Sequence, residues 1–126
     1  MMIVGIGVDL VEIARVERVL RRHPERARVR LFTPGEIAYC DAASRPPQSY
    51  AARFAVKEAF FKAVGTGWGR GIAWNEVEVV GKPGGAPSLR LLGAARAHAD
   101  AIGVRRSHLS ITHSDDTALA FVVLEG

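Results

Sequence analysis

The order of apolar and polar positions along the chain predicts strands mixed with helices. The apolar, β-rich run Met2–Val8 predicts a central strand, and helical spacing of apolar residues follows over Val11–Arg22. The segment Thr33–Glu36 has the features of a helix start: a threonine cap, a proline and then a glutamate. A long helix is predicted from about Ser49 to Val64, where Gly65 ends it.

The second half of the chain favours hairpins. Trp74–Val80 and Ser88–Leu92 have strand-like composition on either side of a turn rich in glycine and proline. Ala94–Ile102 is predicted to form a short helix, and His108–Thr112 and Ala118–Leu124 a final hairpin. Because hairpins join antiparallel strands, we predict an α+β fold rather than a doubly wound sheet.

Length and composition narrow the class of protein. A chain of 126 residues with 48% apolar content suits one domain, which we predict over residues 1–126. Apolar runs stay well short of the roughly 20 residues of a membrane span, and we see no signal-peptide pattern at the start. Cys40 is the single cysteine, which excludes an intrachain disulfide and a thiolate zinc cluster. We therefore expect a cytoplasmic protein in a reducing compartment.

Positive charge is concentrated near the beginning of the chain. The net charge is +4, whereas residues 13–30 alone hold seven arginines against two glutamates, an excess of five. Arg15, Arg18 and Arg22 fall on one helix face by their i, i+3 and i+7 spacing. This stripe predicts an acidic partner, and the alternative is an ordinary solvated helix face.

Two carboxylates in apolar surroundings are the main candidates for chemistry. Asp9 ends the first predicted strand, and Glu58 lies on a mostly apolar helix with Lys62 one turn beyond it. Mg²⁺ usually takes one or two protein carboxylates together with substrate phosphates, and a lysine can neutralise such a phosphate. The alternatives are that Asp9 caps a helix and that Glu58 and Lys62 form a surface salt bridge.

Other polar features add weaker signals. The loop Gly65–Gly71 would let backbone N–H groups approach an anion, although such a loop is often a plain connector. Lys57 and Arg53 could reach a second phosphate. His113, at the end of a strand, could be presented to a site or could be an ordinary surface residue. From the residues alone we predict metal-assisted phosphate chemistry.

The order and the residues of these motifs resemble those of the holo-acyl-carrier-protein synthases, the small class of 4′-phosphopantetheinyl transferases. The resemblance runs essentially from end to end of the chain. The matching segments are Gly5–Leu10, Phe32–Glu36, Arg53–Ala63, Gly65–Gly67, Gly81–Pro83 and Leu109–Ser114.

This resemblance implies a fold, a reaction and a set of site residues. The family fold has a mostly antiparallel sheet and a long central helix. The family transfers the phosphopantetheine arm of coenzyme A to a serine of acyl carrier protein, releases adenosine 3′,5′-bisphosphate and needs Mg²⁺. Asp9 and Glu58 are then the metal ligands, and Glu58 takes the serine proton directly or through water. Lys62 stabilises the leaving phosphate, and His113 contacts a coenzyme A phosphate or assists the metal site. The residues expected to bind coenzyme A are Lys57, Lys62, Gly65, Thr66, Gly67 and His113.

The resemblance also gives the arginine stripe a partner. Acyl carrier proteins are acidic beside the target serine, and the first helix of the family docks there. Fatty acid biosynthesis is the expected context, and neither nucleic acid nor a membrane is expected as a partner. Family members of this size are typically homotrimers whose sites are shared between subunits. The residues expected to contact the carrier protein are Arg15, Arg18, Arg21 and Arg22.

Two departures and two competing functions accompany this interpretation. Asn75 stands where the family often has an acid, so either Glu76 or Glu78 could take its place or the position could be structural. Thr112 stands where serine is commoner. A non-catalytic module could use the arginines to bind an acidic protein or nucleic acid, and it would need neither Asp9 nor Mg²⁺. A Mg²⁺-dependent phosphohydrolase could use the same acids, but a small substrate would not need the arginine stripe.

Overall fold

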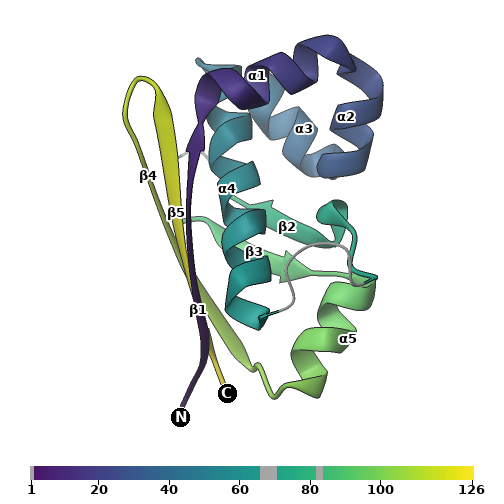
Figure 1. Cartoon of the computed structure of the whole chain (residues 1–126), viewed down its shortest axis with the longest axis vertical. Coiled ribbons are helices and arrows are strands. Elements are labelled where there is room, and N and C mark those ends of the chain that lie inside the picture. The colour runs from purple at the N-terminus through teal and green to yellow at the C-terminus, as the bar shows by residue number, and fades with distance from the viewer. Residues whose placement is uncertain (1, 66–70, 82–83) are drawn as a thin grey trace.

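The computed structural model describes residues 2–65, 71–81 and 84–126, and within them the chain is α+β, as predicted (Figure 1). One long helix lies across a three-stranded sheet, and a second, two-stranded sheet packs nearby. The elements in chain order are β1 Ile3–Glu12, α1 Ile13–Arg22, α2 Pro24–Leu31, α3 Pro34–Asp41, α4 Pro46–Val64, the 3₁₀ turn η1 Trp74–Glu76, β2 Val77–Val80, β3 Ser88–Leu91, α5 Gly93–Ala101, β4 Arg106–His113 and β5 Thr117–Glu125.

The larger sheet has the strand order β1-β5-β4 and is antiparallel throughout. Its central strand β5 alternates strictly, and the side chains that face α4 are fully buried, among them Ala120 and Val122. Asp9 on β1 lies opposite Ala120, which in turn lies opposite Ile111 on β4. This register puts β1 and β4 at the two edges of the sheet, with α4 over the inner face between them.

Two glycines bring β1 unusually close to α4. A Cβ atom at Gly5 would collide with the backbone carbonyl of Ala63, and one at Gly7 with that of Ala59. Because neither position carries a side chain, strand and helix meet backbone to backbone. The next inward-facing position along β1 is Asp9, which is thereby held against the side of α4.

The boundaries of the first strand correct the sequence prediction. Pairing with β5 continues to Glu12, so helix α1 begins at Ile13 rather than Val11. Asp9 therefore lies inside the strand and not at its end, and the cap position of α1 is occupied by Glu12. The alternative that Asp9 caps a helix is wrong, because long-range strand pairing overrides the helical spacing of the apolar residues.

Other boundaries follow local signals more closely. The predicted capping box is confirmed: Thr33 Oγ1 accepts from the Glu36 N–H at 3.2 Å, and Glu36 Oε1 accepts from the Thr33 N–H at 3.0 Å. Helix α4 starts at Pro46, three residues earlier than predicted, and ends where Gly65 takes a φ of 76°. The α2 helix was missed, and Trp74 opens a 3₁₀ turn instead of a strand. Among the described residues, none of the helices is long and apolar enough to cross a membrane.

Candidate active site

The structure brings Asp9 and Lys62 together at the contact between β1 and α4. Lys62 Nζ donates to Asp9 Oδ1 at 2.9 Å and to the Val8 carbonyl at 3.1 Å. The Lys62 side chain is about half exposed, at 54%, whereas that of Asp9 is 12% exposed. In the described part of the chain, Lys62 pairs with Asp9 and forms no ion pair with Glu58. The alternative of a surface salt bridge between Glu58 and Lys62 on one helix is therefore wrong.

Glu58 completes this group of charges. Its pKa is raised, first by burial and next by the Asp9 carboxylate, while Arg15 and Lys62 act in the opposite direction. The pKa of Lys62 is raised in turn by its hydrogen bond to Asp9, and both carboxylates add to this effect. Two partly buried carboxylates therefore share one site with a single half-exposed ammonium group, and a further cation would relieve their repulsion.

This donor set fits a hard divalent cation. Mg²⁺ keeps several waters and takes one or two carboxylates, with substrate phosphates completing its coordination. Within the part of the chain that the structure describes, no group of three or more His, Cys, Asp and Glu side chains could hold a metal ion. An ion between Asp9 and Glu58 would therefore take two carboxylates from the chain, which is the number that Mg²⁺ commonly uses.

The predicted arginine stripe begins next to these carboxylates with Arg15. Arg15, Arg18 and Arg22 are exposed on α1, which packs against α4. Arg15 is near enough to Glu58 to oppose the rise in its pKa. Arg21 pairs with Glu17 on its own helix at 3.5 Å and stays exposed. Exposed arginines therefore lie on α1, which with α2 forms one end of the molecule (Figure 1), and Arg15 is the one shown to be near Glu58.

His113 does not join the carboxylates within one chain. It ends β4, whereas Asp9 is on β1, so the two residues stand at opposite edges of the sheet. His113 instead lines a cavity of about 230 Å³ together with Arg45, Arg53 and Tyr39. The Arg53 guanidinium lies 3.9 Å from the centre of the Tyr39 ring. The sequence analysis missed Arg45, and its position just before the two prolines that start α4 was the available signal.

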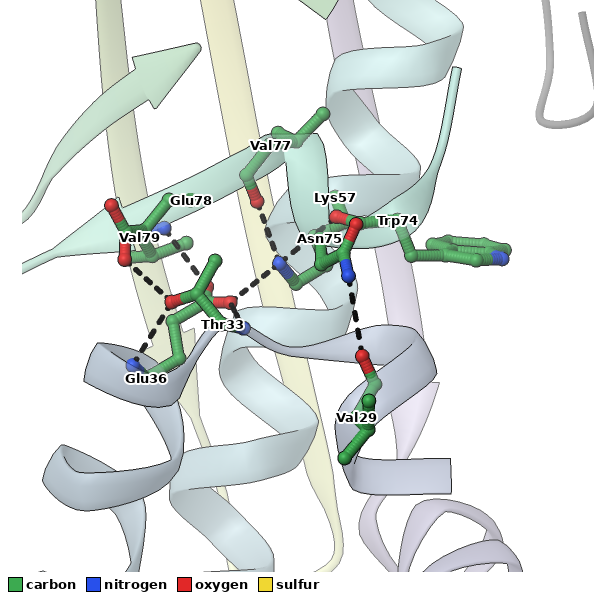
Figure 2. A network of polar contacts seen from close by, with 9 residues as sticks. All are labelled: Val29, Thr33, Glu36, Lys57, Trp74, Asn75, Val77, Glu78 and Val79. Atoms are coloured by element: carbon green, nitrogen blue, oxygen red, sulfur yellow. Dashed lines mark hydrogen bonds and ion pairs between the residues drawn. The ribbon is translucent and has the colours of Figure 1, made fainter. Parts of the chain in front are cut away.

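Lys57 corrects a prediction. Its side chain is fully buried, and its three N–H groups donate to Glu36 Oε1 at 2.7 Å, to the Val77 carbonyl at 2.6 Å and to the Trp74 carbonyl at 3.2 Å (Figure 2). Burial lowers the pKa of Lys57, and the Glu36 carboxylate opposes that shift. With every donor used inside the protein, Lys57 has none left for a coenzyme A phosphate.

The remaining predictions concern the coenzyme A contacts at Gly65, Thr66 and Gly67 and the departure at Thr112. Gly65 is the left-handed end of α4, while Thr66 and Gly67 lie outside the described residues. Thr112 is exposed on β4. Its role, like that of Gly65, stays a prediction.

The positions discussed around Asn75 have structural partners. Asn75 Nδ2 donates to the Val29 carbonyl at 3.2 Å and so ties η1 to α2 (Figure 2). The Glu76 carboxylate accepts the Ala73 and Ala94 N–H groups, at 2.8 and 2.9 Å, which holds the start of α5. Glu78 accepts from the Thr33 hydroxyl. Both acids therefore hold neighbouring parts of the described structure, and a role for either in place of an acid at position 75 stays a prediction.

Known proteins resemble this chain in both sequence and structure. The model of the 4′-phosphopantetheinyl transferase superfamily matches residues 5–122. A holo-[acyl-carrier-protein] synthase of Solibacter usitatus is 46% identical over 98% of this chain and 99% of its own. The crystal structure of the Neisseria meningitidis holo-[acyl-carrier-protein] synthase has a TM-score of 0.88 and 36% identity, covering 99% of this chain and 100% of that one. The Helicobacter pylori synthase in complex with coenzyme A has a TM-score of 0.83 and 31% identity, covering 95% and 99%.

Proposed function

Since the chain belongs to the holo-acyl-carrier-protein synthase family of 4′-phosphopantetheinyl transferases, we propose that it transfers the phosphopantetheine arm of coenzyme A to a serine of an apo acyl carrier protein. The serine oxygen forms a bond to the β-phosphorus, the pyrophosphate bond breaks, and adenosine 3′,5′-bisphosphate leaves. The grouping of Asp9, Glu58 and Lys62 carries this proposal. We also propose that residues 1–126 act as one catalytic domain.

Asp9 and Glu58 would hold Mg²⁺ at this site. When bound, the ion would act as a Lewis acid on the pyrophosphate and neutralise charge in the transition state. The two carboxylates come from different elements, β1 and α4, so the strand and the helix must keep their mutual position for both to serve.

Glu58 is the proposed acceptor of the serine proton. Burial and the Asp9 carboxylate raise the pKa of Glu58 in the metal-free site. A bound cation would lower this pKa, so Glu58 would be ionised there and could accept the proton directly or through water. Lys62 supplies positive charge to the leaving phosphate. Two of its donors point at Asp9 and Val8, which leaves its third N–H and its exposed side for substrate.

Coenzyme A needs contacts beyond this group. We propose that the cavity with His113, Arg45 and Arg53 receives one of its phosphates, because two guanidinium groups and an imidazole suit an anion. In a single chain this cavity is at the sheet edge opposite to Asp9. One coenzyme A molecule would reach both groups if a second copy of the chain brought its β4 edge beside β1.

The outer face of the sheet supports such an assembly. Ile6, Val8 and Leu10 on β1 are 52%, 45% and 63% exposed, and Phe121 on β5 adds to the same apolar face. An apolar face of this kind usually marks an interface. A head-to-tail contact of one edge with the other closes into a ring, and a homotrimer is the assembly that we propose.

The arginine stripe would receive the carrier protein. Arg15, Arg18 and Arg22 are exposed and Arg15 lies near Glu58, so an acidic helix docked along them could present its serine to Glu58. Such contacts raise the association rate and respond to salt more than they add buried energy.

The test is the intact mass of an apo acyl carrier protein after incubation with this protein, coenzyme A and Mg²⁺. We expect the mass to rise by one phosphopantetheine and the gain to disappear with EDTA. A folded sample that modifies none of several apo carriers would contradict the proposal. Coenzyme A cleavage without a carrier would instead indicate a phosphohydrolase.

A further inference from the structure

Lys57 and Glu58 are neighbours on α4 that face different parts of the molecule. Successive residues of a helix point about 100° apart. Glu58 is turned toward Asp9 on β1, whereas Lys57 extends to α3, η1 and β2. The position of Glu58 about the helix axis is therefore linked to whatever holds Lys57.

Lys57 is held by a buried polar cluster, which we define as Lys57, Glu36, Thr33 and Glu78 (Figure 2). Glu36 is its centre: Oε1 accepts from Lys57 Nζ at 2.7 Å and from the Thr33 N–H at 3.0 Å. Glu36 Oε2 accepts from the Val79 N–H at 2.9 Å. The side chains of Lys57 and Glu36 are both 0% exposed. Helix α3, strand β2 and the η1 turn are thus fixed to α4 at one point.

Among the described residues, the side of α4 that faces β1 has no fully buried ion pair. Gly5 and Gly7 meet the helix backbone there, and neither position carries a side chain that could interlock with the helix. The described polar link across this contact is Lys62, which is half exposed and which the proposed reaction assigns to substrate. The buried polar cluster therefore acts together with the apolar packing of α4 to fix the rotation of the helix.

We propose that the Lys57–Glu36 pair is a positioning pair that sets the place of Glu58 relative to Asp9. A rotation of α4 by about 10° would move a carboxylate that lies roughly 5–6 Å from the helix axis by about 1 Å. A displacement of about 1 Å can cost roughly 100-fold in rate. The inference rests on the proposed function for the role of Glu58, and it assigns Lys57 no contact with substrate.

Two variants test the pair. Lys57→Met with Glu36→Gln removes both charges, so no buried charge is left without a partner, and neutral replacements of buried ion pairs often keep the fold. Glu36→Gln alone is the harsher variant, because it leaves the buried Lys57 ammonium without its carboxylate and turns an amide N–H toward the Val79 N–H. We expect both to melt cooperatively, to bind Mn²⁺ about tenfold or more weakly, and to transfer more slowly by a similar factor. The KM for the carrier protein should stay within about twofold, because the arginine stripe is untouched.

The readouts are the melting temperature, kcat and KM of transfer, and the Kd of Mn²⁺ followed by electron paramagnetic resonance without substrates. Glu58→Ala gives the level of Mn²⁺ binding without the site. Tyr50→Phe is the matched control: it removes another buried link between α4 and α3, the 2.7 Å bond from the Tyr50 hydroxyl to Asp41, two turns away from Glu58. It should lower the melting temperature and leave the Kd of Mn²⁺ unchanged.

The outcomes separate this inference from the proposed function. Folded pair variants with wild-type Mn²⁺ affinity and kcat would overturn the positioning role. Equal loss of Mn²⁺ affinity in Tyr50→Phe would also overturn it, because general destabilisation would then explain the effect. If the wild type binds Mn²⁺ but transfers nothing, the proposed reaction fails, while a selective loss of Mn²⁺ binding in the pair variants would still support the positioning role.

Discussion

Two lysines on the same helix, five residues apart, have opposite environments. Lys57 is fully buried and donates its three N–H groups to Glu36 and to two backbone carbonyls. Lys62 is half exposed and bonds to Asp9 and one carbonyl, with its outer side open. The position of each lysine on α4 sets the direction in which its side chain points. The residues that the side chain meets there decide its role. One lysine holds the helix in place, and the other remains available to a ligand.

Glu58→Gln should have the largest effect on the open side of α4. We expect transfer to fall by several orders of magnitude, because the variant loses a metal ligand and the proton acceptor together, while its melting temperature stays near that of the wild type. Intact-mass kinetics and thermal unfolding measure the two quantities. Near-normal turnover would remove Glu58 from the mechanism.

Lys57→Met should have the largest effect on the buried side. The single variant leaves the Glu36 carboxylate buried without its cation, which typically costs about 3–5 kcal/mol of the free energy of unfolding. Urea unfolding measures this loss, and the double variant with Glu36→Gln should recover much of it. A loss below about 1 kcal/mol would show that water or another donor replaces Lys57.

Lys62→Met should reverse that pattern. Because the Lys62 end of the lost ion pair is half exposed, we expect the free energy of unfolding to change by less than about 1 kcal/mol. Transfer should fall roughly 100-fold or more, since the leaving phosphate loses a positioned charge. If Lys62→Met proved as destabilising as Lys57→Met, the contrast between the two lysines would not hold.

Arg18→Glu probes the surface next to the open side. We expect a roughly five- to tenfold rise in the KM for the carrier protein at low salt, which shrinks as salt is added, with coenzyme A affinity unchanged. Arg96→Glu changes an exposed arginine of α5, which lies far from α1 (Figure 1); it is the matched control and should change neither. A fall in coenzyme A affinity would assign the stripe to the wrong substrate.

The smallest expected effect is a pH dependence of stability on the open side. The pKa of Glu58 is raised in the folded state, so the folded protein binds this proton more tightly than the unfolded chain does. Without divalent metal, its contribution to stability is therefore favourable at low pH and is lost as pH rises from the ordinary glutamate range through the raised pKa. Urea unfolding in EDTA at several pH values should show this loss in the wild type and not in Glu58→Gln.

The sequence alone predicts the parts of the fold that depend on interactions between neighbouring residues. The capping box of Thr33 and Glu36 and the end of α4 at Gly65 are decided by neighbouring residues, and both were predicted. The end of β1 depends on pairing with a strand more than a hundred residues away, and helical spacing misplaced it. Distant partners also decide the role of Lys57, because spacing shows that it faces away from Glu58 but not what it meets.

The candidate site divides in the same way. Asp9, Glu58 and Lys62 could be predicted together because each sits in an apolar frame that makes a polar residue conspicuous. The position of His113 could not, since strand order and not sequence order puts it at the far edge of the sheet. Fatty acid biosynthesis and a cytoplasmic location stay predictions.

The glycine contacts between β1 and α4 also set limits on how this sequence can change. At Gly5 and Gly7 even alanine would push the strand away from the helix backbone. A compensating change elsewhere cannot easily make room, because the obstructing atoms are carbonyl groups common to every residue type. The arginines and the outer sheet surface can change one residue at a time during evolution. At these two positions even the smallest added side chain would separate the strand from the helix.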